Sequence, residues 1–282
     1  MLFQARVPAK INLYLRVFGR RADGFHAMET VMLKVGFYDE LSIDVGEGDG
    51  FDLRILGAPD LETRGNLIER ACLLYLAEAR ERRGIRVVLE KNIFMGAGLG
   101  GGSADAAFAL RLMDRAMGAV DPSRLMQIAA SLGSDVPFFM VDESLAFATG
   151  RGEAIRPLSA LPPRPIVLVN PGVHVSTKEA YAGLNRSPMI GAPDGIDPAF
   201  SPGWEGYFSK VPFENDFQSS LEARFPAIAQ ARQALGAAGA SRSMMTGSGS
   251  CVFGIFEEEE AARAALAPLE KHGFRAVFAR SL

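Results

Sequence analysis

Hydrophobic and polar residues alternate in the first part of the chain, and this pattern predicts strands. The run from residue 3 to 17 alternates and then becomes apolar, which indicates strands broken at Pro8. Strand character returns over residues 30–45, 51–56 and 85–90. The N-terminal part of the chain is therefore expected to be rich in β-structure.

Apolar residues take a helical spacing in several later stretches. Asn66 is expected to cap the first of these helices, and Asp121 followed by Pro122 to begin another. A hairpin is predicted over 145–155 and a short buried strand over 166–170. The predicted helices cover 65–80, 103–117, 122–132 and 176–184, a helical region covers 215–235, and a last helix begins with the glutamates 257–260.

Two polar stretches suggest how the chain is divided. Residues 157–165 have the composition of a linker and are the best candidate for a boundary, which gives lobes at 1–160 and 161–282. Residues 185–206 are rich in Pro, Gly and Asp and contain Trp204. They predict a long surface insertion rather than a core element.

Composition narrows the class of protein. With 282 residues, 48% of them hydrophobic, the chain can bury a large core. A net charge of −3 without a basic block gives no reason to expect nucleic acid, and no obligate protein partner is inferred. No signal peptide and no apolar run of ~20 residues are apparent. Cys72 and Cys251 lie far apart, as two buried reduced thiols of a cytoplasmic protein would.

A glycine-rich stretch precedes the helix predicted over 103–117. Five glycines fall between Gly96 and Gly102, and Ser103 follows as a good helix N-cap. Glycine permits positive φ and close approach of the backbone to a ligand. A helix N-terminus offers unpaired N–H groups and the positive end of the helix dipole. The stretch therefore predicts a phosphate-binding loop, with a tight surface turn as the alternative.

Two familiar phosphate loops do not fit this stretch. A Walker loop needs a lysine between its last glycine and Ser103, and none is present. The glycines do match G-x-G-x-x-G, but residues 92–95 separate them from the preceding strand. The acid at ribose-binding distance, Asp121, has the context of a helix cap. A Rossmann domain is therefore not favoured.

Two charged residues stand in apolar surroundings. Lys10 lies between Ala9 and Ile11 in the first strand region, and either it extends to water or it has a function. Asp135 lies between a helix end and Pro137, where it forms a turn or serves as a catalytic base kept from water. These residues alone leave both alternatives open.

The turn at 19–27 contains the hairpin signal Asp23-Gly24 and exposes two rings. Phe25 and His26 at its tip could stack on a flat ligand or pack locally. Tyr181 on the helix predicted over 176–184 is open to the same two interpretations.

Three separated segments resemble the motifs of the GHMP small-molecule kinases. They are PAKINL at 8–13, GAGLGGGSADAA at 96–107 and MTGSGSCVFG at 245–254. GRRADGFH at 19–26, NLIERA, GSDVPFF and the pair Asn215-Asp216 also agree. These resemble most closely the family members that act on a cytidine diphosphate substrate of the non-mevalonate isoprenoid pathway. The resemblance covers almost the whole chain.

The resemblance implies a fold and an activity. The expected fold is a two-lobed α+β kinase, with an N-terminal lobe like ribosomal protein S5, a left-handed β-α-β element, a C-terminal α/β lobe and the active site between the lobes. The expected reaction is phosphorylation of the 2-hydroxyl of the cytidine diphosphate substrate by Mg-ATP. The catalytic pair would be Lys10 and Asp135.

The resemblance also implies binding residues. The nucleotide would lie against Asn66, Phe94, Met95, Gly96, Ala97, Gly98, Leu99, Gly100, Gly101, Gly102, Ser103 and Ala104. The substrate would contact Asn12, Phe25, His26 and Tyr181. Because Phe25 lies on a loop tip and Tyr181 on a helix just after the lobe boundary, we predict from their positions that the two rings enclose the cytosine while His26 reads its hydrogen-bonding edge. Ser103 is a candidate ligand of Mg²⁺, whose other ligands the sequence does not indicate.

The chain departs from the family pattern in four places. Phe94 replaces a proline, Phe25 a tyrosine and Thr246 a common serine, and the insertion at 185–206 is longer than usual. Two rival functions remain: another kinase of the family acting on mevalonate-type or sugar substrates, and a nucleotide-binding sensor without catalysis. Phe25 and His26 suit a cytosine, and the catalytic pair argues against a sensor.

Overall fold

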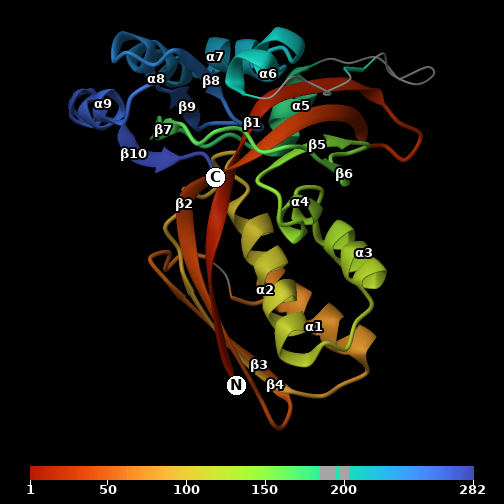
Figure 1. Cartoon of the computed structure of the whole chain (residues 1–282). Helices are drawn as coiled ribbons and strands as arrows, with labels where there is room; N and C mark the ends of the chain where they lie inside the picture. The colour runs from red at the N-terminus through yellow and green to blue at the C-terminus, as the bar shows by residue number, and fades with distance from the viewer. Residues whose placement is uncertain (62, 185–194, 197–202) are drawn as a thin grey trace. The chain divides into compact units, whose positions relative to one another are not determined.

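The computed structural model describes residues 1–61, 63–184, 195–196 and 203–282 (Figure 1). Most of the predicted insertion, residues 185–194 and 197–202, therefore lies outside the described residues.

The chain forms two compact units, each built from several segments. The first comprises residues 1–9, 38–93 and 100–142, and the second comprises residues 10–37, 94–99 and 143–282. The units differ from the expected segments 1–160 and 161–282, because the strands β1 (Leu2–Arg20) and β2 (His26–Gly46) each contribute residues to both.

β1 is continuous, so the predicted break at Pro8 is wrong. The strand runs from Leu2 to Arg20 and pairs with β2. A proline lacks an N–H donor but is tolerated in a strand at the edge of a sheet. The turn predicted after this strand is confirmed, because residues 21–25 connect β1 to β2.

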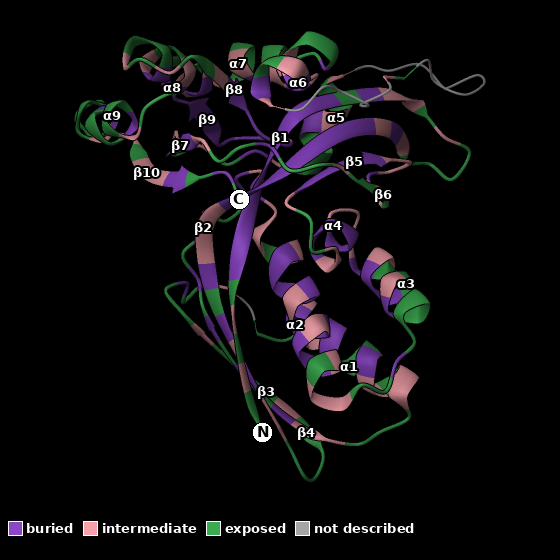
Figure 2. Ribbon diagram, in the orientation of Figure 1, coloured by how far each residue is buried: buried purple, intermediate pink, exposed green. Residues whose placement is uncertain are grey.

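The first unit combines a short sheet with a group of helices. β2 pairs antiparallel with β4, and β4 pairs parallel with β3. Helix α2 packs against α1, α3 and α4, and its inward face is buried (Figure 2). The elements are β3 (Gly50–Leu56), α1 (Leu67–Ala79), β4 (Gly84–Glu90), α2 (Gly101–Met117), α3 (Pro122–Leu132) and α4 (Val136–Met140).

Both predicted helix caps of this unit are confirmed. Asn66 Oδ1 accepts a hydrogen bond from the N–H of Ile68 at 3.0 Å. Asp121 Oδ1 accepts one from the N–H of Ser123 at 2.8 Å, ahead of Pro122 at the first position of α3. These caps act within two residues, which is why sequence alone locates them.

The second unit contains a hairpin and a four-stranded antiparallel sheet in the order β10-β7-β9-β8. Helices α8 and α9 pack on this sheet. Its elements are β5 (Leu145–Thr149), β6 (Ala154–Pro157), β7 (Pro165–Asn170), α5 (Thr177–Gly183), α6 (Trp204–Lys210), α7 (Gln218–Arg224), α8 (Pro226–Ala237), β8 (Arg242–Met245), β9 (Val252–Ile255), α9 (Glu259–Lys271) and β10 (Arg275–Arg280).

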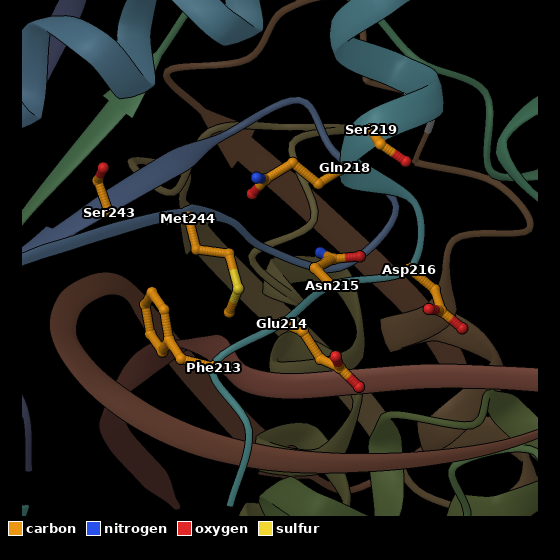
Figure 3. Close-up of a pocket in the computed structure, with 8 residues that line it drawn as sticks. All are labelled: Phe213, Glu214, Asn215, Asp216, Gln218, Ser219, Ser243 and Met244. Carbon is orange, nitrogen blue, oxygen red and sulfur yellow. The ribbon is translucent and has the colours of Figure 1, made fainter. Parts of the chain in front are cut away.

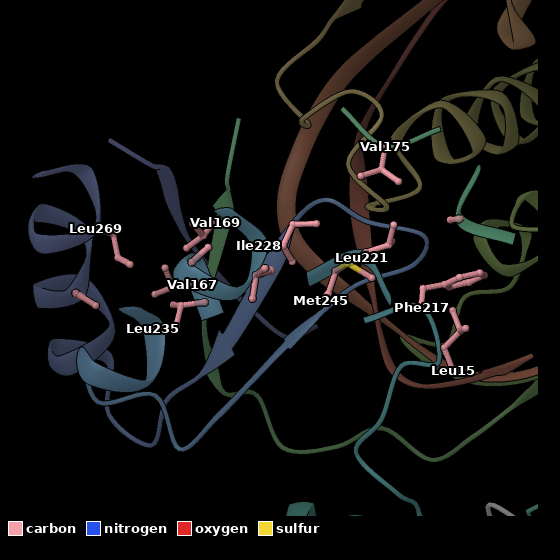
Figure 4. Packing of buried hydrophobic residues seen from close by; sticks show 14 of the residues in the cluster. Leu15, Val167, Val169, Val175, Phe217, Leu221, Ile228, Leu235, Met245 and Leu269 are labelled. Carbon is pink, nitrogen blue, oxygen red and sulfur yellow. The ribbon is translucent and has the colours of Figure 1, made fainter. Parts of the chain in front are cut away.

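A large apolar cluster lies between this sheet and its helices (Figure 4). Val167 and Val169 of β7 pack there with Leu235 of α8 and Leu269 of α9. Full burial of such side chains contributes about 1.5–3 kcal/mol each. The cluster therefore gives the segments that surround it a stable support.

The end of the predicted surface insertion is a core element instead. Trp204 is 4% exposed and begins α6. Its indole N–H donates to the carbonyl of Pro162 at 2.7 Å, and its ring lies 5.6 Å from that of Phe208. Burial of a large ring outweighs the polar composition of the residues that precede it.

Cys72 and Cys251 are both buried and free, as predicted. Burial raises the pKa of each thiol to about 12. Within the part of the chain that the structure describes, no helix is both long and apolar enough to cross a membrane.

Candidate active site

Lys10 is buried in the middle of β1, with 3% of its surface exposed. Its ammonium donates to Asn12 Oδ1 at 2.8 Å, and its backbone N–H donates to the carbonyl of Leu99 at 3.0 Å. Residues two apart in a strand share a face, which places Asn12 beside the ammonium. The alternative in which Lys10 extends to solvent is therefore wrong. A buried lysine is costly without such partners.

Asn12 joins the lysine to a distant loop. Its backbone N–H donates to Thr246 Oγ1 at 3.0 Å, and its Oδ1 lies 3.1 Å from the same hydroxyl. Its amide Nδ2 donates to Thr30 Oγ1 at 2.7 Å. These contacts engage both ends of the Asn12 amide, so the side chain orients Lys10. Contact of Asn12 with substrate stays a prediction.

Two glycine-containing segments of the second unit, residues 96–99 and 246–251, lie backbone against backbone. Gly98 has φ +77°, and a Cβ there would collide with the carbonyl oxygen of Thr246. Gly247 has φ +57°, and its Cβ would lie 2.9 Å from the Gly98 oxygen. The N–H of Cys251 donates to the carbonyl of Ala97 at 3.1 Å. Glycine is therefore required at both positions for conformation and for space.

The segment after Phe213 holds the second of these loops in place. Asn215 Nδ2 donates to the carbonyls of Met245 and Gly247 at 2.8 and 2.9 Å, and Gln218 Oε1 accepts from the N–H of Met245 at 2.9 Å. Asn215 and Gln218 line a pocket (Figure 3), whose volume is about 300 Å³. Asn215, which the sequence included only as part of a resemblance, thus has a definite structural role.

Helix α2 begins at Gly101, two residues earlier than predicted. Gly100, with φ +70°, is the N-cap, and Ser103 lies in the first turn; the expectation that Ser103 caps the helix is wrong. A left-handed cap needs no Cβ, which Gly100 satisfies and a serine does not. The first N–H groups of α2 have no intrahelical partner, and Gly100 has no side chain to cap them. This is the arrangement that binds an anion.

Side chains next to the loop face in different directions. Phe94 is 5% exposed, with its ring 5.2 Å from Phe37 and 5.0 Å from the Arg275 guanidinium, so it anchors the loop. Met95 is 52% exposed. Ala97, Leu99 and Ala104 are buried, so only their backbone can reach a ligand.

A buried ionic cluster supports the start of α2 within the first unit. Lys91 follows β4, and its ammonium donates to Asp39 of β2 and, at 2.8 Å, to Asp105 of α2. Asp39 Oδ1 also accepts from the N–H groups of Asn92 and Ile93, at 2.6 and 2.8 Å. Asp105 Oδ1 is buried without a hydrogen-bond partner among the described residues. The cluster ties the strands to the helix that carries the glycines.

Burial and the neighbouring charges of this cluster shift the pKa values of Asp105 and Lys91. Burial raises the pKa of Asp105, the Lys91 ammonium lowers it and the Asp39 carboxylate raises it again, so that it reaches about 7. Burial alone would lower the pKa of Lys91, but the Asp105 and Asp39 carboxylates outweigh it and raise the pKa. Lys91 therefore remains charged, and Asp105 is the group that titrates near neutral pH.

We expect Asp105→Asn to change the pH dependence of stability. The folded pKa of Asp105 lies above the unfolded value of ~3.9. The folded protein thus holds a proton that the unfolded chain releases between about pH 4 and 7, and stability falls as pH rises through this window. The free energy of unfolding of the variant minus that of the wild type should grow from pH 5 to 7, by at most about 1.4 kcal/mol per unit.

Urea unfolding at pH 5, 6 and 7 measures this difference. The matched control is Asp121→Asn, because the Ser123 hydroxyl lowers the pKa of that exposed cap and it titrates below this range. A difference for Asp105→Asn that does not vary with pH would contradict the expectation.

Asp135 is half-buried at the N-cap position of α4, in the first unit. Its side chain makes no capping hydrogen bond to that helix within the described residues. The residues that follow, Val136, Phe138 and Phe139, are fully buried. Asp135 thus lies in the turn that precedes α4, and its catalytic role stays a prediction.

The three residues expected around the cytosine all lie in the second unit. Phe25 is 53% exposed, with the Arg151 guanidinium 4.7 Å from its ring centre. The His26 ring lies 5.3 Å from that of Tyr181, which also packs edge-on against Phe217 at 4.9 Å. His26 Nδ1 lies 3.1 Å from the carbonyl of Phe18, which fixes the imidazole. The structure thus places Tyr181 beside His26, and Phe25 beside Arg151.

The residues fit Mg²⁺ only with a nucleotide present. Among the described residues, no group of three His, Cys, Asp or Glu side chains could hold a metal ion. Mg²⁺ commonly keeps several waters and binds one or two side chains together with substrate phosphates. The Ser103 hydroxyl in the first turn of α2 suits such a minor ligand.

Several residues of this site escaped sequence reasoning. Asp39, Lys91 and Asp105 were not recognised as a cluster, although a lysine directly after a strand was a usable signal. At Thr246 the sequence shows only a departure from the family's common serine and does not indicate what its hydroxyl contacts. Their partners lie up to 234 residues away in sequence, and no local pattern reports such distances.

Two segments match a known family of enzymes. Residues 66–143 match the N-terminal domain of the GHMP kinases, and residues 209–274 match their C-terminal domain.

Similarity to individual proteins extends over the whole chain. The chain is 39% identical to 4-diphosphocytidyl-2-C-methyl-D-erythritol kinase of Syntrophotalea carbinolica, in an alignment that covers 95% of each protein. It is 40% identical to the enzyme of the same name from Desulfotalea psychrophila, in an alignment that covers 89% of this chain and 85% of that protein. A crystal structure of 4-(cytidine 5'-diphospho)-2C-methyl-D-erythritol kinase matches with TM-score 0.80 and 35% identity over 99% of each chain. A homoserine kinase of Cytophaga hutchinsonii is only 16% identical but shares the fold, with a TM-score of 0.73 over 100% of this chain and 94% of that one.

Proposed function

The chain belongs to the 4-diphosphocytidyl-2-C-methyl-D-erythritol kinases within the GHMP kinase family, and we propose that it phosphorylates the 2-hydroxyl of 4-(cytidine 5'-diphospho)-2-C-methyl-D-erythritol with ATP. This step belongs to the non-mevalonate route to isoprenoid precursors. The observation that carries the proposal is that buried Lys10 is hydrogen bonded, directly and through Asn12, to both glycine-rich loops.

The phosphates of ATP bind the loop from Gly96 to Ser103. Positive φ at Gly96, Gly98 and Gly100 supports this, because it gives the loop a backbone shape that side-chain-bearing residues rarely adopt and that can turn N–H groups toward a ligand. The uncapped N–H groups at the start of α2 provide donors and a favourable dipole. Asn66 and Met95 complete the nucleotide site.

Lys10 and Asp135 share the chemistry. Phosphoryl transfer passes through a loose transition state, so positioning and charge stabilisation dominate. A carboxylate is too weak a base to deprotonate an alcohol beforehand, so Asp135 accepts the proton late, as the bond to phosphorus forms. The positively charged Lys10 ammonium stabilises the negative charge on the transferring phosphoryl group. Mg²⁺, when bound with ATP, neutralises phosphate charge, and Ser103 is its proposed side-chain ligand.

The cytosine binds at Phe25, His26 and Tyr181. The exposed Phe25 ring supports this, because stacking needs an open face. The imidazole of His26, anchored at Phe18, offers its other nitrogen to the edge of the base. Asn12 is proposed to bind substrate in addition to orienting Lys10.

Residues 1–160 form the functional nucleotide-binding lobe and residues 161–282 the C-terminal lobe. A division there falls between the matched family domains, which end at 143 and begin at 209. The protein is proposed to be a cytoplasmic enzyme that acts on small molecules. Its two free buried cysteines and its net charge of −3 support this proposal.

The function is tested by measuring ATP-dependent phosphorylation of four acceptors under one set of conditions. We expect the highest kcat/KM with the cytidyl substrate, compared with mevalonate, homoserine and galactose. A preference for one of the other three would assign a different GHMP kinase activity. ATP binding without a phosphorylated product from any acceptor would indicate a nucleotide sensor instead.

A further inference from the structure

The hydroxyl of Thr246 lies where β1 meets both glycine-rich loops. Thr246 is fully buried. Its Oγ1 accepts from the N–H of Asn12 at 3.0 Å and lies 3.1 Å from Asn12 Oδ1 and 3.5 Å from the carbonyl oxygen of Gly98. A hydroxyl has one proton to donate, and the shorter contact assigns it to Asn12 Oδ1. Asn12 is therefore held by Thr246 at two atoms.

The same oxygen of Asn12 also binds the ammonium of Lys10. Oδ1 accepts from Lys10 at 2.8 Å and from the Thr246 hydroxyl at 3.1 Å, which uses both of its lone pairs. The opposite end of the amide donates to Thr30. The position of the ammonium is thus set through one amide whose orientation depends on the Thr246 hydroxyl.

The backbone around Thr246 is held rigidly. Its N–H donates to the carbonyl of Cys251 at 2.9 Å, and Asn215 Nδ2 donates to the carbonyls of the two neighbouring residues, Met245 and Gly247. The Thr246 carbonyl abuts Gly98 so closely that only glycine fits there. Because this backbone cannot move to compensate, a shift of the Thr246 side chain displaces the residues that it contacts, Asn12 and Gly98.

We propose that Thr246 is a positioning residue that fixes the Lys10 ammonium relative to the phosphate-binding loop. The inference rests on the proposed function, in which Lys10 acts at the transferring phosphoryl group and Gly98 belongs to the nucleotide site. Thr246 itself touches neither substrate; it acts through Asn12 and through the backbone of Gly98. A displacement of about 1 Å in such a constellation can cost about 10²-fold in rate.

The test compares two near-isosteric replacements. Thr246→Val keeps the shape and removes the hydroxyl, whereas Thr246→Ser keeps the hydroxyl and removes a methyl group. We expect Thr246→Val to lower kcat roughly 5- to 50-fold and to weaken binding of a non-hydrolysable ATP analogue. Thr246→Ser should restore both to within about threefold of the wild type.

A matched control separates positioning from loss of stability. Ser250 lies in the same loop, is 1% exposed and donates its hydroxyl to the carbonyl of Val173, away from Lys10. Ser250→Ala should lower the melting temperature with little change in kcat per folded molecule. If Thr246→Val does not fold, Thr246→Ala carries the same expectation.

The outcomes are distinct. Turnover of the hydroxyl-free variant within twofold of the wild type, or a serine variant as impaired as the valine one, would overturn the inference. A wild-type protein that fails to phosphorylate the cytidyl substrate would refute the proposed function alone. The inference would then stand or fall on analogue binding, which needs no acceptor.

Discussion

Asp135→Asn is expected to lower kcat at least ~10²-fold while ATP binding stays intact. Asparagine keeps the size of the side chain and removes its capacity to accept a proton. Asp135 precedes the buried residues of α4, and the near-isosteric asparagine leaves their apolar packing unchanged. The decrease in kcat therefore reflects the loss of proton transfer to Asp135 in the transition state.

Steady-state kinetics with the cytidyl substrate and equilibrium binding of ATP measure the two quantities. Asp142→Asn is the matched control: it removes a carboxylate just beyond α4, and this side chain is 88% exposed and paired with Arg111. Such surface pairs contribute little, so its kcat should match the wild type. Turnover near the wild-type rate in Asp135→Asn would eliminate Asp135 as the base.

Phe25→Ala and Tyr181→Ala are expected to raise KM for the cytidyl substrate roughly 5- to 150-fold each, because base–ring stacking contributes about 1–3 kcal/mol. The cytosine is remote from the reacting hydroxyl, so the lost contact stabilises ground state and transition state alike. kcat should therefore change little.

The two variants should differ in their effect on the stability of the fold. Phe25 is exposed, whereas Tyr181 packs on Phe217 and on the apolar cluster of the second unit. Tyr181→Ala should therefore also lower the melting temperature, and Phe25→Ala should not.

Both constants are measured for each variant, with Phe3→Ala as the control, because that ring also lies beneath an arginine, Arg115 at 5.8 Å, but in the first unit. An unchanged KM would remove that residue from the base site. A collapse of kcat alone would assign it a structural role.

Local features of the fold were predictable because the interactions that produce them span only a few residues. The cap of α1 at Asn66, the start of α3 at Asp121 and the turn ahead of β2 all depend on neighbours in sequence. The strand pattern of 51–56 and 85–90 likewise records which side chains face the core.

Errors arose where tertiary contacts override local preference. Trp204 lies in a polar stretch, yet burial of its ring and a hydrogen bond to Pro162 make it a core residue. Pro8 suggested a break, but an edge strand accommodates it. Ser103 has the better capping side chain, but the left-handed backbone at Gly100 decides where α2 begins.

The amino-acid sequence alone was enough to identify the class of the protein and to mark two unusual charged residues. Three motifs identified the kinase family, and the apolar neighbours of Lys10 and Asp135 made both residues stand out. The contacts of each charge, in contrast, became known only from the three-dimensional fold. Lys10 depends on a hydroxyl 236 positions away at Thr246, reached through Asn12, and Lys91 joins Asp39 to Asp105 across two strands and a helix. A hydrogen bond acts over about 3 Å in space regardless of separation along the chain, so periodicity and composition contain no record of it.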